Sequence, residues 1–221
     1  MISFAGLAPD VAQAMCTPMH LILPASASAS SPSTPSTSTS SPPTPATGAL
    51  YLGAVTAVLD PSLLAEHHIQ HLVQVLDVPW LPAPPPGLTA YRMDILDLES
   101  VDLRPHLDGA VADIDAALRA GRNVLVHCQQ GVSRSPAVVI AYLIRKRGMG
   151  YEAAAALVRQ RRPCVKPNAG FVRCLKEWGA ATQATAQAQA QATAQAQAAG
   201  YAPPVRGAAR PTARTREVLS H

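Results

Sequence analysis

Between residues 50 and 178 the chain shows two patterns of apolar and polar positions. Short runs rich in Val, Leu and Ile are typical of buried strands, and they lie at residues 50–58, 72–78, 91–96 and 123–127. Helix-start signals and apolar residues at helical spacing predict helices over residues 60–69, 102–119, 135–147, 151–162 and 168–178. Strands that alternate with helices predict an α/β domain, with a central, mostly parallel sheet of about five strands flanked by helices.

Two tracts of biased composition flank that region. Residues 25–47 are almost entirely Ser, Thr, Pro and Ala, and residues 179–200 alternate Ala with Gln and Thr. Neither tract has enough large apolar side chains to offset the entropy lost on ordering it. We therefore expect three parts: a disordered N-terminal segment (1–48), one folded domain (49–179) and a low-complexity, basic C-terminal tail (180–221).

Net charge, apolar runs and cysteine spacing indicate which partners and which compartment to expect. The net charge is +4, part of it on arginines of the tail, where Tyr201 is the one aromatic residue, so we expect no nucleic-acid partner. Pro9, Asp10 and Pro18 interrupt the first apolar residues, so we expect neither a secretory signal nor a membrane span. Four cysteines without paired spacing favour a reducing compartment, the cytoplasm, the nucleus or both. We also expect a monomer.

The sequence VLVHCQQGVSRSP, residues 124–136, concentrates the residues suited to chemistry. A buried strand is predicted to end at His127, and a helix is predicted to start near Arg134. Ligands of open α/β sheets bind beyond the carboxyl ends of strands, where the first N–H groups of a helix favour an anion. Cys128 lies at the base of this loop, where N–H donors and a nearby arginine are expected to keep its thiol as a thiolate near neutral pH.

The remaining residues of the loop suit the binding of a tetrahedral oxyanion such as phosphate. The planar guanidinium of Arg134 can bind two of its oxygens. Gly131 allows the loop to turn so that its N–H groups converge, and Ser135 offers a hydroxyl close to the thiol. We expect Cys128 to be a nucleophile rather than a plain buried thiol, and we expect the substrate to be bound by the residues that follow it: Gln129, Gln130, Gly131, Val132, Ser133 and Arg134.

This pattern, H-C-x-x-G-x-x-R-S with C-x5-R inside it, resembles the signature of the cysteine-based protein tyrosine phosphatases. The S-R-S ending resembles the dual-specificity branch, and D-x4-D-L-x2-H-L with HCQQGVSRS is most similar to its small, atypical members. The resemblance extends over residues 50–178, including LYLGAVTAVLD and SPAVVIAYLIRKRGMGYEAAAALVRQRRPCVKPNAGF. It implies the phosphatase fold for residues 49–179 and a reaction that needs neither a metal nor a cofactor.

Cleavage of a phosphoester also needs an acid for the leaving oxygen and a base for the water of the second step. The family that this chain resembles uses one aspartate for both, ahead of a second aspartate that begins the next helix. Asp97 matches that position, because Asp102 is best explained as the N-cap of the helix. Asp94 remains the alternative, and Glu99 is a poorer match.

The resemblance gives supporting roles to residues on either side of the loop. It implies that His127 orients the loop and tunes Cys128 by hydrogen bonding, and that Asn168 supports the loop. Three histidines beside a glutamate have poor spacing for a metal site, and a helix surface explains them better: His67, His68 and His71 with Glu66. A basic cluster is either a solvated helix end or a second anion site beside the pocket: Arg159, Arg161, Arg162 and Lys166.

Three functions remain to be distinguished. The first is a protein phosphatase that hydrolyses phosphotyrosine and phosphoserine/threonine of phosphoprotein substrates through a cysteinyl-phosphate intermediate. The second is a phosphatase for a phosphoinositide, an RNA 5′-phosphate or a phosphoglucan. Its phosphoinositide form is disfavoured because the loop lacks the lysines typical of those enzymes. The third is an inactive phosphate-binding adaptor, which the presence of Cys128, Arg134 and an acid candidate disfavours.

Overall fold

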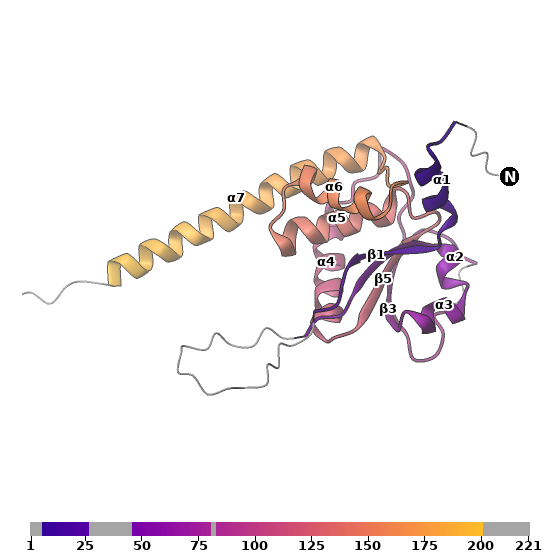
Figure 1. Cartoon of the computed structure of the whole chain (residues 1–221). Coiled ribbons are helices and arrows are strands. Elements are labelled where there is room, and N and C mark those ends of the chain that lie inside the picture. Colours follow the sequence, from indigo (N-terminus) through magenta and orange to yellow (C-terminus); the bar gives the residue numbers. More distant parts are fainter. Residues whose placement is uncertain (1–5, 27–45, 81–82, 201–221) are drawn as a thin grey trace, which may run out of the picture. The chain divides into compact units, whose positions relative to one another are not determined.

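The computed structural model describes residues 6–26, 46–80 and 83–200 of the chain (Figure 1). Its elements are α1 (Pro9–Cys16), β1 (Met19–Leu23), β2 (Leu50–Ala54), α2 (Val55–Val58), α3 (Pro61–Glu66), β3 (Ile69–Val75), β4 (Thr89–Met93), α4 (Arg104–Arg119), β5 (Asn123–Cys128), α5 (Arg134–Arg147), α6 (Tyr151–Arg161) and α7 (Ala169–Gly200). The chain divides into a first unit that ends at Gln183 and a second unit that begins at Ala184. Across the described ranges, no helix combines the length and the apolar content that a membrane span requires.

The five strands form one sheet in the order β1-β2-β5-β3-β4. The pairs β2–β5, β5–β3 and β3–β4 are parallel, and β1 runs antiparallel to β2. This arrangement confirms the predicted α/β class with a mostly parallel, five-stranded sheet. Because β5 lies in the middle, the loop after Cys128 emerges at the centre of the sheet's carboxyl edge, where α/β folds bind ligands.

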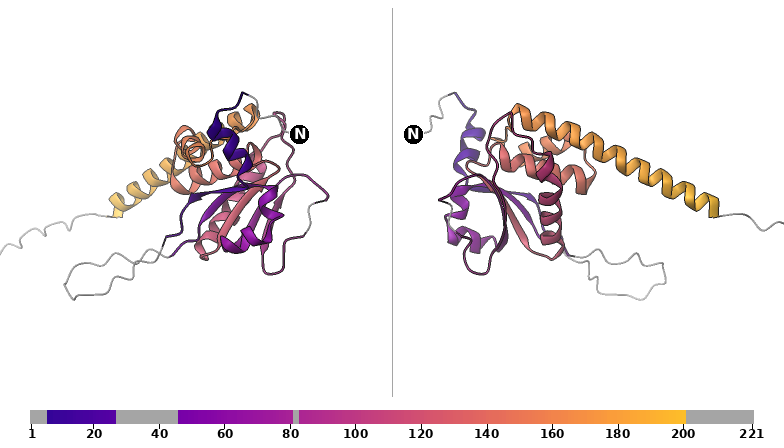
Figure 2. Two further views of the ribbon diagram at one scale, coloured as in Figure 1. Left: turned by 45° about the vertical axis from the view of Figure 1, so that its right-hand side comes forward. Right: turned by 180° about the vertical axis from the view of Figure 1, so that it is seen from behind.

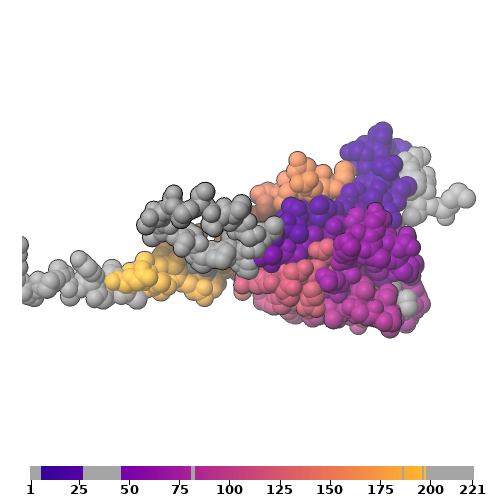
Figure 3. Space-filling view, turned by 60° about the horizontal axis from the view of Figure 1, so that its bottom comes forward, coloured from indigo at the N-terminus to yellow at the C-terminus, as the bar shows by residue number. Residues whose placement is uncertain are grey.

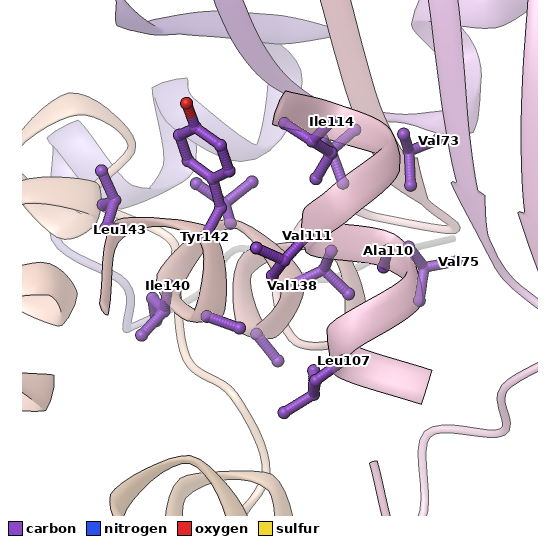
Figure 4. Packing of buried hydrophobic residues seen from close by; sticks show 14 of the residues in the cluster. Val73, Val75, Leu107, Ala110, Val111, Ile114, Val138, Ile140, Tyr142 and Leu143 are labelled. Atoms are coloured by element: carbon purple, nitrogen blue, oxygen red, sulfur yellow. The ribbon is translucent and has the colours of Figure 1, made fainter. Parts of the chain in front are cut away.

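Helices cover both faces of the sheet, as the two views of Figure 2 show. Neighbouring side chains of a strand point to opposite faces, so the strands contribute to two separate apolar clusters. The smaller cluster joins the sheet to α2 and α3 and includes Met19, Ala57, Val58, Leu64, Leu72 and Leu125. The larger one joins the sheet to α4 and α5, and Figure 4 shows Val73 and Val75 of β3 beside Ala110 and Ile114 of α4.

The helix that follows the central loop is apolar on all sides. The residues of α5 from Ser135 to Ile144 are all buried, because the helix lies against the sheet and against α4 and α6. A helix buried in this way cannot move without disturbing the core, so it fixes the position of Arg134 at its first turn. The helix ends at Arg147, as predicted, and its C-cap Gly148 has a left-handed φ of 64°.

The folded unit begins well before residue 49, so the predicted disordered segment over residues 1–48 is wrong for residues 9–23. Strand β1 pairs with β2 and buries Met19 and Ile22, which a five-residue pattern did not reveal. Ser26 and Thr47 also pair, with two backbone hydrogen bonds of 3.1 Å and hydroxyl oxygens 2.8 Å apart. The Ser/Thr/Pro tract therefore connects two paired strands. Its residues 27–45 lie outside the described residues.

The helix that closes the folded domain continues beyond residue 179. Helix α7 buries Phe171, Leu175 and Trp178 in the first unit, and it continues as a helix to Gly200. The expectation that the Ala/Gln/Thr tract stays unordered is wrong for these residues. Ala has the highest helix propensity and Gln ranks close to it, so this composition favours a helix without an apolar core. The tail arginines and Tyr201 lie outside the described residues.

Candidate active site

Cys128, the last residue of β5, lies buried at the base of the central loop. Its Sγ accepts hydrogen bonds from the Gly131 N–H at 3.3 Å and from the Ser135 hydroxyl at 3.2 Å. Gly131 has a φ of +67°, and a Cβ there would lie 2.6 Å from the Gly53 carbonyl oxygen. Glycine is thus required both by the turn and by the close approach to β2. Two donors directed at one sulfur suit a negatively charged nucleophile.

Arg134 is the first residue of α5, and its side chain is only 14% exposed. One guanidinium nitrogen, Nη1, donates to the Ile95 carbonyl at 3.2 Å, which ties the arginine to the segment after β4. The buried Nε finds no hydrogen-bond acceptor among the described residues. A buried donor without a partner costs free energy that an oxyanion would recover. The guanidinium is therefore held in place and retains a donor for a ligand.

Asp97 lies over the central loop, in the connection between β4 and α4. Its Oδ1 accepts hydrogen bonds from the Ser133 hydroxyl at 2.6 Å and from Asn168 Nδ2 at 2.8 Å. Its Oδ2 lies 3.8 Å from Arg134 Nε, and the side chain is 37% exposed. The carboxyl group therefore sits beside the arginine and remains open to solvent. Sequence reasoning did not anticipate the contact with Ser133.

The other acid candidates lie elsewhere. Asp94 forms an exposed ion pair with Arg92, with 2.6 Å between Oδ1 and Nε, and Glu99 is exposed. Asp102 Oδ1 accepts the backbone N–H of Arg104 at 3.0 Å. Hydrogen bonds from the Arg104 side chain and backbone lower the pKa of Asp102 to about 2. Asp102 thus supports the start of α4, although the N-cap itself is the next residue, Leu103, and not Asp102 as predicted.

Asn168 connects three parts of the site. Its backbone N–H donates to Ser133 Oγ at 3.1 Å, and its Nδ2 donates to Asp97. Its Oδ1 accepts the backbone N–H of Phe171 at 2.9 Å, which caps the first turn of α7. The side chain thus joins the central loop, the candidate acid and the next helix.

The His127 ring is not one of the two donors to the Cys128 thiol, which are the Gly131 N–H and the Ser135 hydroxyl. The ring is completely buried, and neither of its nitrogens has a hydrogen-bond partner among the described residues. Burial lowers the pKa of His127 to about 4, so the ring is neutral at pH 7. The ring lies away from the thiol because consecutive side chains of β5 point to opposite faces of the sheet.

The basic cluster divides into two kinds of residue. Arg159, Arg161 and Lys166 are exposed, whereas Arg162 is completely buried. Its Nε donates to the Gly131 carbonyl and its Nη2 donates to the Gln130 carbonyl, each at 3.0 Å. Neither expectation for the cluster applies to Arg162, which is neither solvated nor open to an anion.

The histidine cluster also differs from its expected place on a helix surface. His71 lies on β3 and is buried, with Nδ1 2.7 Å from Thr89 Oγ1 and Nε2 2.6 Å from Asp113 Oδ2. His67 is the C-cap of α3, and His68 follows it with a φ of 49°. Within the described part of the chain, no three His, Cys, Asp or Glu side chains are grouped so that they could hold a metal ion.

The site thus combines a cysteine, an arginine and an aspartate at a loop between a central strand and a buried helix. Residues 50–181 match the family model for the dual specificity phosphatase, catalytic domain. The chain belongs to this family. Dual specificity protein phosphatase 1 of Arabidopsis thaliana is 37% identical over 138 residues, which cover 62% of this chain and 69% of that protein. Dual specificity phosphatase 28 of Mus musculus is 37% identical over 139 residues, 62% of this chain and 84% of that protein.

Solved structures of dual specificity phosphatases share the fold. The crystal structure of human DUSP28 aligns with a TM-score of 0.57 at 36% identity, over 61% of this chain and 90% of that one. The crystal structure of DUSP15 aligns with a TM-score of 0.59 at 29% identity, over 63% and 88%. The protein is thus a small, atypical dual specificity phosphatase. The segment of α1 and β1 precedes the residues that the family model matches.

Proposed function

We propose that this phosphatase hydrolyses phosphotyrosine and phosphoserine/threonine in proteins through a cysteinyl-phosphate intermediate, with Cys128 as the nucleophile. The observation that carries the proposal is the position of Cys128 Sγ, which accepts hydrogen bonds from the Gly131 N–H and the Ser135 hydroxyl at the base of the loop. Donors that stabilise a thiolate also make it a better leaving group in the second step.

In the first step, the Cys128 thiolate attacks phosphorus, so that an S–P bond forms while the P–O bond to the leaving group breaks. Arg134 binds non-bridging oxygens of the phosphoryl group through its fixed guanidinium, whose Nε has no acceptor among the described residues. The protonated Asp97 gives its proton to the leaving oxygen, which departs as a neutral alcohol or phenol.

In the second step, water attacks the phosphorus of the cysteinyl phosphate. Asp97, now a carboxylate, takes the proton of that water, and the S–P bond breaks to release phosphate and the thiolate. Ser133 and Asn168 hold Oδ1 of Asp97, so Oδ2 is the oxygen that carries the proton in both steps. None of these transfers requires a metal or a cofactor.

Two features of the loop and its surroundings support a phosphoprotein substrate. The side chains of Gln129, Gln130 and Val132 are uncharged, which disfavours the multiple phosphates of a phosphoinositide. A hollow beside Asn168 is lined by Lys166, Val172 and Arg173, among others. Glu99 and Glu177 also line it, so it offers charges of both signs and apolar surface to the residues that flank a phosphorylated side chain.

Release of phosphate from para-nitrophenyl phosphate by the wild type and by Cys128→Ser tests the reaction. We expect turnover by the wild type, background rates for the variant, and binding of inorganic phosphate by both. Equal rates for the two proteins would remove Cys128 from the mechanism. Binding without turnover by the wild type would identify an adaptor.

A panel of substrates tests the chemical class. We expect phosphotyrosine and phosphoserine/threonine peptides to be hydrolysed faster than phosphoinositides, 5′-phosphorylated RNA or a phosphoglucan. The reverse order would assign the enzyme to a non-protein substrate.

We further propose that the phosphatase is a monomer and that it acts in a reducing compartment, the cytoplasm, the nucleus or both. The four free cysteines favour the reducing compartment. Light scattering measures the oligomeric state, and microscopy of a fluorescent fusion protein shows the cellular compartment.

A further inference from the structure

Arg162 is a fully buried cation without an acidic partner. Its exposed fraction is 0%, and no carboxylate among the described residues forms an ion pair with it. Instead its guanidinium donates four hydrogen bonds of 2.8–3.0 Å to three carbonyl oxygens and an imidazole nitrogen, and the Cys164 side chain also interacts with it. Burial lowers the pKa of Arg162, but an arginine stays protonated in proteins. A buried charge of this kind requires every one of its hydrogen bonds.

Two of those hydrogen bonds bind backbone carbonyl groups of the catalytic loop. Nη2 binds the Gln130 carbonyl, and Nε binds the Gly131 carbonyl. The Gln130 carbonyl and the Gly131 N–H belong to one planar peptide, in which the two groups point in opposite directions. That N–H donates to Cys128 Sγ. By binding the oxygen of this peptide, Arg162 keeps its hydrogen directed at the nucleophile.

The other two hydrogen bonds are donated to acceptors of the N-terminal segment. Nη1 of Arg162 donates to the Thr17 carbonyl at 2.9 Å and to His20 Nδ1 at 2.8 Å. Thr17 is the C-cap of α1, and His20 lies on β1, which packs against α6. Figure 3 shows the indigo N-terminal segment lying directly against the body of the domain. Both residues precede residue 50, where the match to the family begins.

We propose that His20 and the Thr17 carbonyl, acting through Arg162, are positioning groups for the phosphate-binding loop. The segment that carries them completes the set of acceptors that Arg162 needs, and Arg162 in turn orients the peptide of Gln130 and Gly131. His20 must present an unprotonated Nδ1 to accept from Arg162. Burial and the neighbouring Arg162 charge lower the pKa of His20, which favours that form. The inference rests on the proposed role of the loop in binding phosphate.

Three single variants on β1 test the proposal. His20→Ala removes the acceptor, whereas His20→Asn replaces Nδ1 with a carbonyl oxygen at the same number of bonds from the backbone. Leu21→Ala is the matched control, because the neighbouring Leu21 is 42% exposed and takes no part in this network. Each variant is compared with the wild type for the dissociation constant of inorganic phosphate and for kcat/KM with para-nitrophenyl phosphate.

We expect His20→Ala to weaken phosphate binding and to lower kcat/KM by about 10-fold, in line with the loss of one hydrogen bond to a charged group. His20→Asn is expected to recover both to within about 3-fold of the wild type. Leu21→Ala should match the wild type. Recovery by asparagine is a result that a general loss of packing would not give.

A folded His20→Ala protein with wild-type phosphate affinity and kcat/KM would overturn the inference. If His20→Ala does not fold, Arg162→Lys decides, because lysine keeps the charge but cannot bind two loop carbonyls and two N-terminal acceptors together. Wild-type phosphate affinity in Arg162→Lys would then overturn it. A wild type that neither binds phosphate nor turns over would instead defeat the proposed function.

Discussion

Ser133 Oγ lies 2.6 Å from Asp97 Oδ1, so a single short hydrogen bond joins the phosphate-binding loop to the candidate acid. Asn168 Nδ2 donates to the same oxygen at 2.8 Å. The position of Asp97 therefore depends on two segments that follow it in the chain, as well as on its own loop. With Oδ1 occupied by these donors, Oδ2 is the oxygen available for proton transfer.

Asp97→Asn is expected to lower kcat by about 10²–10³-fold, because the variant cannot protonate the leaving oxygen. The affinity for inorganic phosphate should remain at the wild-type value, since the loop and Arg134 are unchanged. Steady-state kinetics with phosphopeptides and inhibition by phosphate measure the two quantities. Asp94→Asn, which removes only an exposed ion pair, serves as the control and should keep wild-type kcat. Equal losses of turnover and phosphate affinity in Asp97→Asn would contradict the assignment.

Asn168 has two functions that a pair of variants can separate. Asn168→Ser and Asn168→Ala both lose the Nδ2 donor to Asp97, and both should lower kcat by about 3–10-fold, as expected for one lost hydrogen bond. Serine still accepts the Phe171 N–H at the start of α7, whereas alanine does not. Only Asn168→Ala should therefore lose about 1 kcal/mol of unfolding free energy. Urea denaturation and kinetics on both proteins check the separation, and a normal kcat in either variant would argue against the link to Asp97.

The sequence was most informative where function depends on consecutive residues. Cys128, Gly131 and Arg134 lie within one strand, one loop and the first turn of one helix, so their spacing alone predicts a cradle for an oxyanion. Asp97 could be placed only through the resemblance, because it matches the acid position of that family ahead of Asp102. The structure supplies the physical reason for its nearness: β4, like β5, is a parallel strand whose carboxyl end meets the same edge of the sheet.

Interactions between distant residues could not be read from any local pattern. His20 and Arg162 are separated by 142 positions, and Arg162 lies in a run of basic residues that is otherwise solvated. Only the pairing of β1 with β2 brings the N-terminal segment to α6 and buries the guanidinium. Strand β1 was not predicted for the same reason, because a tract rich in Ser, Thr and Pro separates it from its partner β2 in the sequence.

Gly131→Ala is expected to damage both stability and function. The residue has a φ of +67°, and an added Cβ would lie 2.6 Å from the Gly53 oxygen and 2.9 Å from Arg162 Nη2. We expect a loss of about 2–3 kcal/mol in unfolding free energy and no measurable phosphate binding. Gly121→Ala is a matched control, with a φ of +75° and no atom within 4 Å of the added Cβ. Gly121→Ala should lower the unfolding free energy by about 1 kcal/mol and leave activity intact. Equal effects of the two substitutions would show that only backbone strain, and not the close contacts of Gly131, matters.

Acid should destabilise the protein through His127. Burial lowers the pKa of this ring from its ordinary value of 6.5 to about 4. Between these values the unfolded chain binds a proton that the folded protein does not, so stability falls as the pH is lowered through this interval. The interval corresponds to about 3 kcal/mol, which is fully present above pH 6.5 and lost by about pH 4.

His127→Gln removes that titration and tests its size. The variant is expected to be less stable than the wild type at pH 7, because a buried amide replaces the ring, but its stability should change less between pH 7 and pH 4.5. Urea unfolding of both proteins at the two pH values gives the comparison. His20 also has a lowered pKa, and it is present in both proteins, so the difference between their pH dependences isolates His127. Identical pH dependences would mean that the buried ring takes up its proton equally well in the folded and unfolded protein.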